Sequence, residues 1–445
     1  MHLLDTVTNL KCPDEQVLFY DSRAAISKAD LVSSINHGRD RFRHLHGKSV
    51  ALKISDRLAL GTTLAIFDGL VSRMVLIPPE TDNETTQVFL NDSCSDVLIT
   101  NPDDLQMVSG DSAAIPSIHE LLETEWVLTT SGTTASPKLV KHSLLSLTKT
   151  ARPGKPGAGF RWGLTYAMER FAGLQVYLQA MISGSSLVFT DRNATLEETV
   201  ATFVRHDVNS ISATPSLWRK FLMTPGLEQL ALKTITLGGE IADQAVLGAL
   251  RNRFPDAHVQ HIYASTEAGV GFSVTDGLAG FPVSYLDGGI DGGQLRISDH
   301  GTLLIRSMAR ANSYIGREDL SVNDDGYFDT GDLIELTGDR CYFRGRHNGA
   351  INVGGNKVQP ELVESVLHEL DEVAMASVSA FRSSIVGNLV RARIVPTRPM
   401  VKADQNAFSK RIKQHCGERL EKYMVPALID FVDEIETGST GKVAR

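Results

Sequence analysis

Short apolar runs alternate with amphipathic stretches up to about residue 264, and this alternation limits the possible folds more than any other feature of the sequence. Residues 49–54, 74–78 and 96–100 are typical of buried strands, and residues 57–72 carry apolar side chains at helical spacing. The same kind of strand recurs at 185–190, 210–214, 234–239 and 259–264. This repeat of strand, helix and strand predicts an α/β protein.

The pattern changes twice after that point. Beyond Gly280, short strands and Gly-Asp turns predict a small barrel-like segment. From Pro360, a helix, two strands and a second helix over 405–422 predict a small α+β unit. We therefore expect a large N-terminal domain, 1–347, and a small mobile C-terminal domain, 348–445.

Charge and composition exclude several functional classes. The net charge is -9, from 44 Lys and Arg against 53 Asp and Glu, so nucleic acid is a poor candidate partner. No apolar run approaches the ~20 residues that span a bilayer, and the N-terminus lacks a secretory pattern, so we expect a cytoplasmic protein without a membrane partner. The cysteines, Cys12, Cys94, Cys341 and Cys416, have neither disulfide nor zinc spacing.

Residues 126–143, WVLTTSGTTASPKLVKHS, have the chemistry of a phosphate-binding loop. Small residues let the backbone approach a ligand, hydroxyl and amide groups donate to phosphate oxygens, and a lysine adds positive charge. The spacing does not fit a Walker loop, and a solvated Ser/Thr turn is the structural alternative. The candidate residues are Thr130, Ser131, Gly132, Thr133, Thr134 and Lys138.

Four further segments follow in order: YASTEAG (263–269), GYFDTGDL (326–333), GRHNGAINVGGNKVQPELVE (345–364) and GSTGKVAR (438–445). Together with the loop they resemble the motif set of the adenylate-forming superfamily, which contains acyl-CoA synthetases, adenylation domains of peptide synthetases and luciferases. The modest length and the Gln-Pro-Glu after GGNKV are similar to compact CoA ligases such as o-succinylbenzoate:CoA ligase and aryl-CoA ligases.

The resemblance implies an ATP-dependent enzyme and assigns binding roles. The loop would hold the β- and γ-phosphates of ATP, and Tyr263 would stack on the adenine. Asp332 would accept hydrogen bonds from the ribose, with Arg346 as a second ribose and phosphate contact. The remaining adenine-pocket residues would be Gly238, Gly239, Glu240 and Ala264.

The resemblance also assigns the chemistry. Lys442 would be the main catalytic residue, because two anions must meet and a mobile cation lowers their repulsion. Thr266 would contact the α-phosphate and the acyl carboxylate, and Glu267 would hold Mg²⁺, a hard cation that suits a carboxylate beside phosphates. The C-terminal domain would turn about Asn348 and present a CoA tunnel formed by Val353, Gly354, Gly355 and Lys357.

Four positions depart from the family pattern: Ala135, Leu139, Ala264 and Asn348. Each change is small or locally tolerable, and Asn adopts unusual backbone dihedrals more readily than most residues. None removes a charged catalytic group, so we expect an active enzyme, with a non-catalytic ATP-binding sensor as the alternative from another class.

The substrate is expected to be a carboxylic acid. Phe171 falls near the position where amino-acid-activating relatives carry an aspartate, which makes an α-amino acid a poor candidate. The expected acyl pocket of Trp162, Tyr166, Phe171 and Trp218 suits an aryl or medium-length acyl group. We expect an acid–thiol ligase that forms acyl-AMP and then an acyl-CoA, with the phosphopantetheine of an acyl carrier protein as the alternative acceptor. The sequence does not determine the oligomeric state, and both a monomer and a homodimer stay open.

Overall fold

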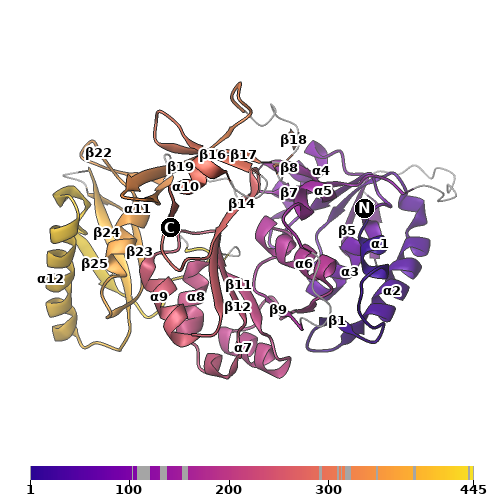
Figure 1. Cartoon of the computed structure of the whole chain (residues 1–445), viewed down its shortest axis with the longest axis horizontal. Coiled ribbons are helices and arrows are strands. Elements are labelled where there is room, and N and C mark those ends of the chain that lie inside the picture. The colour runs from indigo at the N-terminus through magenta and orange to yellow at the C-terminus, as the bar shows by residue number, and fades with distance from the viewer. Residues whose placement is uncertain are drawn as a thin grey trace.

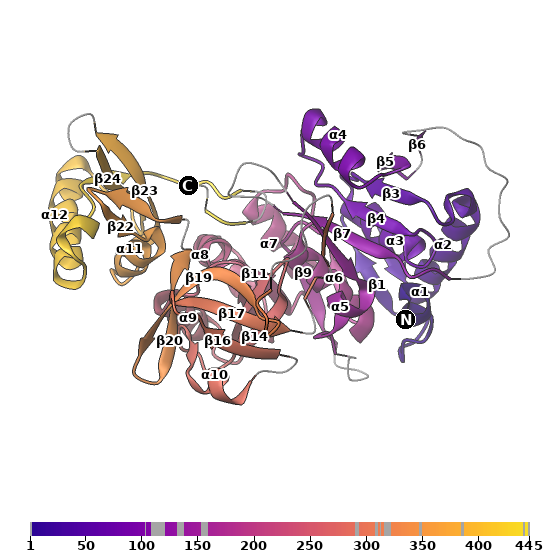
Figure 2. The same cartoon turned by 90° about the horizontal axis from the view of Figure 1, so that it is seen from above.

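The computed structural model describes residues 2–102, 104–107, 121–130, 138–152, 159–289, 293–307, 310–311, 313–315, 322–346, 349–383, 387–438 and 441–443. Two large sheets and one small sheet form a body, and a smaller unit from the C-terminal part of the chain lies at one end of it (Figure 1). The end of the chain, marked C, lies between that unit and the body (Figure 2).

The first large sheet contains the N-terminal strand and helix repeat. Its order is β18-β8-β7-β4-β3-β5-β6, and the strands from β7 to β5 run parallel. Helices α3 (Arg57–Phe67) and α4 (Asn83–Asp92) follow Asp56 and Asp82, whose carboxylates cap their first turns. The strands are β3 (Ser49–Leu52), β4 (Arg73–Leu76), β5 (Val97–Asn101), β6 (Asp104–Met107), β7 (Glu125–Thr129), β8 (Leu139–Ser143) and β18 (Ser313–Ile315).

The second large sheet has the order β14-β13-β12-β11-β9-β10-β1-β2, and it is parallel from β13 to β1. Its strands are β1 (Val17–Tyr20), β2 (Ala25–Ser27), β9 (Arg161–Leu164), β10 (Ser186–Val188), β11 (Ser210–Ala213), β12 (Thr234–Gly238), β13 (His258–Ser265) and β14 (Gly269–Val274). The other helices of the body are α1 (Leu3–Thr8), α2 (Lys28–Arg41), α5 (Leu144–Thr148), α6 (Phe171–Ser183), α7 (Leu196–Arg205), α8 (Pro215–Met223) and α9 (Gln244–Arg253), with the short 3₁₀ turns η1 (Arg43–Leu45) and η2 (Leu227–Gln229).

The small sheet of the body is antiparallel, with the order β15-β20-β19-β17-β16. Its elements are β15 (Phe281–Pro282), α10 (Ser284–Gly288), β16 (Gly293–Ile297), β17 (Thr302–Ser307), β19 (Phe328–Thr337) and β20 (Arg340–Arg346). Strand β20 ends at the candidate residue Arg346, immediately before the predicted hinge.

The C-terminal unit has its own core, in which Val363, Val378, Ile394 and Phe408 are buried. Helices α11 and α12 pack with a sheet of order β23-β24-β25, and β21 and β22 form a hairpin. The elements are β21 (Ile351–Val353), β22 (Asn356–Val358), α11 (Pro360–Leu367), β23 (Val373–Ser383), β24 (Gly387–Pro396), α12 (Lys402–Arg419), η4 (Lys422–Met424) and β25 (Leu428–Phe431).

The predicted α/β class, with a large N-terminal part and a smaller C-terminal part, is confirmed. The boundary at 347/348 stays a prediction, because Asn348 lies outside the described residues. Among the described residues, no helix has the length and the apolar character that crossing a membrane requires.

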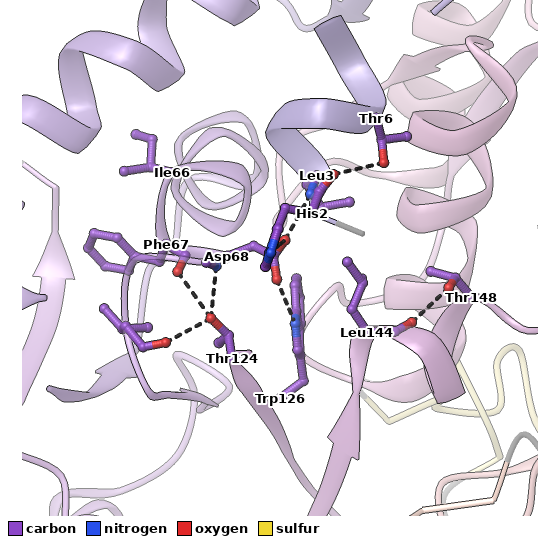
Figure 3. Close-up of polar contacts among 12 residues, drawn as sticks. His2, Leu3, Thr6, Ile66, Phe67, Asp68, Thr124, Trp126, Leu144 and Thr148 are labelled. Carbon is purple, nitrogen blue, oxygen red and sulfur yellow. Dashed lines mark hydrogen bonds and ion pairs between the residues drawn. The ribbon is translucent and has the colours of Figure 1, made fainter. Parts of the chain in front are cut away.

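The buried carboxylate of Asp68 attaches the N-terminal helix to the first large sheet (Figure 3). Its Oδ2 accepts the backbone N–H of Leu3 at 2.8 Å, and its Oδ1 accepts the indole N–H of Trp126 at 3.2 Å. Close by, Thr124 receives the N–H of Gly69 and donates to the carbonyl of Val71. These bonds satisfy buried polar groups at the amino end of β7, the opposite end of the strand from the candidate phosphate loop.

Candidate active site

A cavity of about 1730 Å³ lies where the two large sheets, the small sheet and the C-terminal unit meet. Many of the residues predicted from the sequence line it. These are Thr130, Lys138, Trp162, Tyr166, Phe171, Gly238, Gly239, Glu240, Tyr263, Ala264, Thr266, Glu267, Asp332, Arg346 and Lys442. Residues more than 300 positions apart in the sequence therefore share one cavity.

The candidate phosphate loop is described at its two ends. The backbone N–H of Thr130 donates to the carbonyl of Lys138 at 2.9 Å, and the N–H of Lys138 donates to the Thr130 hydroxyl at 3.3 Å. This closed base places both ends of the loop at the cavity. Ser131, Gly132, Thr133 and Thr134, and the departure Ala135, lie outside the described residues.

Tyr314 connects the loop to the proposed metal ligand. The ammonium of Lys138 lies 4.7 Å from the centre of the Tyr314 ring, and the Tyr314 hydroxyl lies 3.5 Å from Oε1 of Glu267. Strand β18 makes this possible because Tyr314 pairs with Val140, two residues beyond Lys138. The sequence analysis missed Tyr314, which lies in none of the recognised motifs.

His142 positions the turn that carries Thr266 and Glu267. The ring is fully buried; its Nε2 lies 2.7 Å from the carbonyl oxygen of Thr266, and its Nδ1 lies 3.1 Å from the Ser146 hydroxyl. Burial lowers the pKa of His142 to about 4, so the ring is neutral near pH 7 and its Nε2–H donates to Thr266. His142 belongs to the segment 126–143 that contains the candidate phosphate loop, but only the fold brings it next to Thr266.

Glu267 is a suitable ligand for a magnesium ion that arrives with ATP. Its backbone carbonyl accepts the N–H of Ala311 at 2.9 Å, which fixes the main chain beneath the carboxylate. The described residues contain no cluster of three or more His, Cys, Asp or Glu that could hold a metal ion. One carboxylate together with phosphate oxygens is a common arrangement for Mg²⁺, so the residues present fit this ion.

Tyr263, Asp332 and Arg346 form a connected group. The Tyr263 hydroxyl donates to Oδ2 of Asp332, and Nε of Arg346 donates to Oδ1 at 3.0 Å. Burial, and then the neighbouring Asp332, raise the pKa of Tyr263 well above its usual value, so the phenol keeps its proton. The Tyr263 ring is stacked with Phe272 and Phe343, whose centres lie 5.4 and 5.0 Å away. Tyr263 therefore joins an aromatic cluster to the Asp332–Arg346 pair at the cavity.

Side chains of the body hold the segment around Lys442 through hydrogen bonds to its backbone. The Thr214 hydroxyl donates to the carbonyl of Gly441 at 2.5 Å, and Oε1 of Glu240 accepts the N–H of Val443 at 3.0 Å. Oε2 of Glu240 accepts the N–H of Ser216 at 3.0 Å. Glu240, which the sequence placed only in the adenine pocket, thus joins helix α8 to the C-terminal segment.

Gly239 lets the lysine approach. Its φ is +82°, a conformation that glycine tolerates best, and a Cβ there would lie 3.3 Å from Cε of Lys442. The Gly-Gly-Glu sequence at 238–240 therefore supplies both the space for Lys442 and the carboxylate that fixes the following residue.

A buried ionic group forms a further contact between the C-terminal unit and the body. Asp243 accepts from Arg219 and from Nδ1 of His368, which is 3.1 Å away, while Nε2 of His368 accepts the N–H of Ala376 at 3.1 Å. Burial alone would raise the pKa of Asp243, but the hydrogen bond from His368 and the charge of Arg219 lower it. These contacts stabilise the orientation in which Lys442 lines the cavity.

The predicted CoA-tunnel residues lie elsewhere in this orientation. The turn between β21 and β22 is exposed, with Gly354 and Gly355 at positive φ, and none of Val353, Gly354, Gly355 and Lys357 lines the cavity. The hinge candidate Asn348 lies outside the described residues.

One acyl-pocket residue is misplaced by the sequence analysis. Trp218 is fully buried among the residues beneath β11 and β12, its indole N–H donates to the carbonyl of Thr236 at 3.0 Å, and it does not line the cavity. Helix α8 turns this side chain toward the core, whereas Pro215, Ser216 and Arg219 of the same helix do line the cavity. Trp218 is therefore removed from the candidate pocket.

Family models match most of the regions that form the site. The chain matches a model described as AMP-binding enzyme over residues 123–314 and one described as AMP-binding enzyme C-terminal domain over residues 362–442. Together the matches cover more than half of the chain and contain the candidate loop, Glu267 and Lys442.

Two sequence relatives and one solved structure agree with these matches. The 2-succinylbenzoate–CoA ligase of Bacillus subtilis is 26% identical over 363 residues, which are 77% of this chain and 72% of the relative. The D-alanine–D-alanyl carrier protein ligase of Staphylococcus aureus is 26% identical over 344 residues, 73% of this chain and 70% of the relative. The structure of an anthranilate CoA ligase in complex with anthranoyl-AMP has a TM-score of 0.81 at 17% identity, over 100% of this chain and 95% of that one, which shows a common fold.

Proposed function

This chain belongs to the adenylate-forming superfamily of AMP-binding ligases, and on that premise we propose that it is a carboxylate:CoA ligase with two half-reactions. In the first, a carboxylate oxygen of the substrate attacks the α-phosphorus of ATP, the bond to the pyrophosphate oxygen breaks, and acyl-AMP forms. In the second, the thiol of CoA attacks the acyl carbon and AMP leaves.

The arrangement around Lys442 is the observation that carries this proposal. Its side chain lines the same cavity as Thr266, Glu267 and Asp332, although it lies three residues from the end of the chain. Two hydrogen bonds hold the backbone on either side of it: the Thr214 hydroxyl donates to the carbonyl of Gly441, and the N–H of Val443 donates to the Glu240 carboxylate. Such a placement suits a cation that lowers the repulsion between a carboxylate and the α-phosphate.

The other residues have matching roles in the first step. Thr130 and Lys138, with the loop between them, would bind the outer phosphates, and Asp332 would accept from the ribose hydroxyls. Arg346 would add a charge near the ribose and phosphate. The magnesium ion that accompanies ATP would be held by Glu267 and would neutralise phosphate charge.

The second step requires a different orientation of the C-terminal domain. We propose that residues 348–445 turn about Asn348, which withdraws Lys442 and brings the turn between β21 and β22 to the cavity. The exposed glycines of this turn, Gly354 and Gly355, would let pantetheine pass close to the backbone. Val353 and Lys357 would border the same passage.

An acyl carrier protein is the second candidate acceptor. The staphylococcal relative is named as a carrier protein ligase, and a carrier protein offers the same phosphopantetheine thiol as CoA. That relative is also named for an amino acid, whereas the cavity-lining residues of α6, which include Phe171, carry no carboxylate to pair with an ammonium group. This difference favours an acid without an α-amino group.

The proposal is tested by pyrophosphate release with a panel of carboxylic acids, run with CoA, with a carrier protein and with neither. We expect acid-dependent pyrophosphate without an acceptor and a thioester with CoA. Lys442→Ala should lose adenylation while the exposed Lys402→Ala keeps it, and Glu267→Gln should weaken the use of magnesium-ATP. Full adenylation by Lys442→Ala would refute the mechanism, and ATP binding without turnover of any acid would indicate a sensor.

A further inference from the structure

Three neighbouring strands of the second sheet carry a polar row on the face toward the cavity. Ser212 on β11 pairs with Thr236 on β12, and Thr236 pairs with Gln260 on β13. All three residues line the cavity. On the opposite face of the same strands, Ile211, Ile235 and Val259 are buried against helices α7, α8 and α9.

This polar row is unusual for its position. Parallel strands covered on both faces are normally apolar throughout, because a buried polar group without a partner destabilises the fold. Thr236 is only 4% exposed, yet its side chain lines the cavity and does not pack among apolar side chains. A ligand that supplies hydrogen bonds would account for polar side chains at this place.

The contacts within the row define what such a ligand must offer. Nε2 of Gln260 donates to Oγ1 of Thr236 at 3.1 Å. Because that oxygen accepts, the Thr236 hydroxyl proton can donate to another group, and Oε1 of Gln260 can accept. Among the described residues, neither of these two groups has another side-chain partner. An adjacent donor and acceptor match a hydroxyl or a primary carboxamide, each of which both donates and accepts.

The row also has a defined distance from the candidate adenine pocket. Two pairs closer to the carboxyl ends of the strands, Gly238 pairs with Ile262, directly before Gly239 and Tyr263 of the candidate adenine pocket. Two residues along a strand span ~7 Å. Trp162, Phe171 and Val176 contribute apolar lining from β9 and α6, and Trp162 pairs with Ser210, two residues before Ser212 of the row.

We infer that the substrate is a carboxylic acid with an uncharged hydroxyl or carboxamide group at the end away from its carboxylate, where Thr236 and Gln260 bind it. An aromatic acid with such a group opposite the carboxylate has this form. The inference rests on the proposed function and narrows its substrate from aryl or medium acyl groups in general.

The experiment compares acids that differ only at the distant group: 4-hydroxybenzoate, 4-carbamoylbenzoate, 4-methylbenzoate and terephthalate, with acid-dependent pyrophosphate release as the readout. We expect kcat/KM for the hydroxyl or carboxamide acid to exceed that of the methyl acid by roughly 100-fold, because the methyl group leaves the polar pair without a partner. An equal or better rate with 4-methylbenzoate or terephthalate would overturn the inference while leaving the proposed function intact. Pyrophosphate release with none of these four acids, but with others of the broader panel, would also overturn the inference, whereas release with no acid of the broader panel would contradict the proposed function.

Variants of the polar pair give a second readout. The double change Thr236→Val and Gln260→Leu keeps the volume but removes both hydrogen-bonding groups, so it should abolish the preference or reverse it toward 4-methylbenzoate. Thr236→Ser should keep the preference, and Thr202→Val, on the exposed side of α7, serves as the matched surface control. An unchanged preference in the double variant would contradict the assignment. The wild-type panel needs no variant and remains decisive if the double variant fails to fold.

Discussion

The carboxylate of Glu240 accepts the backbone N–H of Val443 at 3.0 Å, and this bond fixes the residue that directly follows Lys442. On the other side of the lysine, the Thr214 hydroxyl donates to the carbonyl of Gly441. The two bonds hold the main chain on either side of the lysine, whose side chain lines the cavity. They also join the C-terminal segment to the body, and the proposed turn of the C-terminal domain would break them, so they should serve the first half-reaction and not the second.

We therefore expect Glu240→Ala and Thr214→Val to lower acyl-AMP formation roughly 10- to 100-fold, as expected for losing one or two hydrogen bonds that position a charged group. Thioester formation from preformed acyl-AMP and CoA should stay close to wild type. The measurement is single-turnover kinetics of each half-reaction.

Thr214 also caps helix α8, since its side chain accepts the N–H of Leu217 at 3.1 Å. Thr214→Ser keeps both hydrogen bonds and loses only the side-chain methyl group, so it should behave like the wild type. This variant separates the role of the hydroxyl from that of the methyl group. Equal losses in both half-reactions would point to a general structural defect and against a role in holding Lys442.

Tyr314 should affect ATP use through Lys138. Tyr314→Ala removes the ring 4.7 Å from the ammonium and should raise KM for ATP about fivefold, since cation–π contacts contribute on the order of 1 kcal/mol. Tyr314→Phe keeps the ring and loses only the hydroxyl near Glu267, so its KM for ATP should lie near the wild-type value. Steady-state kinetics with ATP as the varied substrate check this, and identical KM values for the Ala and wild-type proteins would contradict it.

His142 should make stability depend on pH. Its pKa is about 4 in the folded protein and about 6.5 in the unfolded chain, so only the unfolded chain gains a proton as pH falls from 6.5 to 4. The free energy of unfolding should therefore decrease by about 3 kcal/mol over that window. His142→Gln retains an N–H that can donate to Thr266 and cannot titrate, so denaturation at several pH values should show a smaller loss for this variant. Parallel curves for the two proteins would refute the assignment.

Asp68 should matter for stability but not for chemistry. Asp68→Ala leaves the buried N–H groups of Leu3 and Trp126 without their acceptor, which should cost about 3 kcal/mol. The exposed Asp5→Ala in helix α1 is the matched control and should have little effect. Thermal unfolding of both variants gives the comparison, and equal midpoints would show that Asp68 does not anchor the helix.

Much of the fold follows from local patterns. The alternation of residues 49–100 predicts β3, α3, β4 and β5 within a few positions, because a buried strand and an amphipathic helix have different apolar periods. The capping aspartates Asp56 and Asp82 explain where α3 and α4 begin. The motif order likewise pointed to residues such as Asp332 and Lys442, which the fold then brings to one cavity.

Other features depended on contacts between distant parts of the chain. An aromatic residue near a pocket motif suggested that Trp218 lines the cavity, but only the packing of α8 shows that it faces the core. Nothing in the local sequence indicates that His142 meets Thr266 or that Tyr314 meets Lys138, since each pair depends on how separate strands and turns approach one another.

The sequence by itself determined the succession of elements, the family and the charged groups available for chemistry, because these depend on residue type and short-range spacing. Only the tertiary structure decided that Ser212, Thr236 and Gln260 form one row and that Glu240 holds the residue after Lys442. The physical reason is register: alternation along a strand divides its residues between two faces, but pairing with neighbouring strands decides which side chains become neighbours.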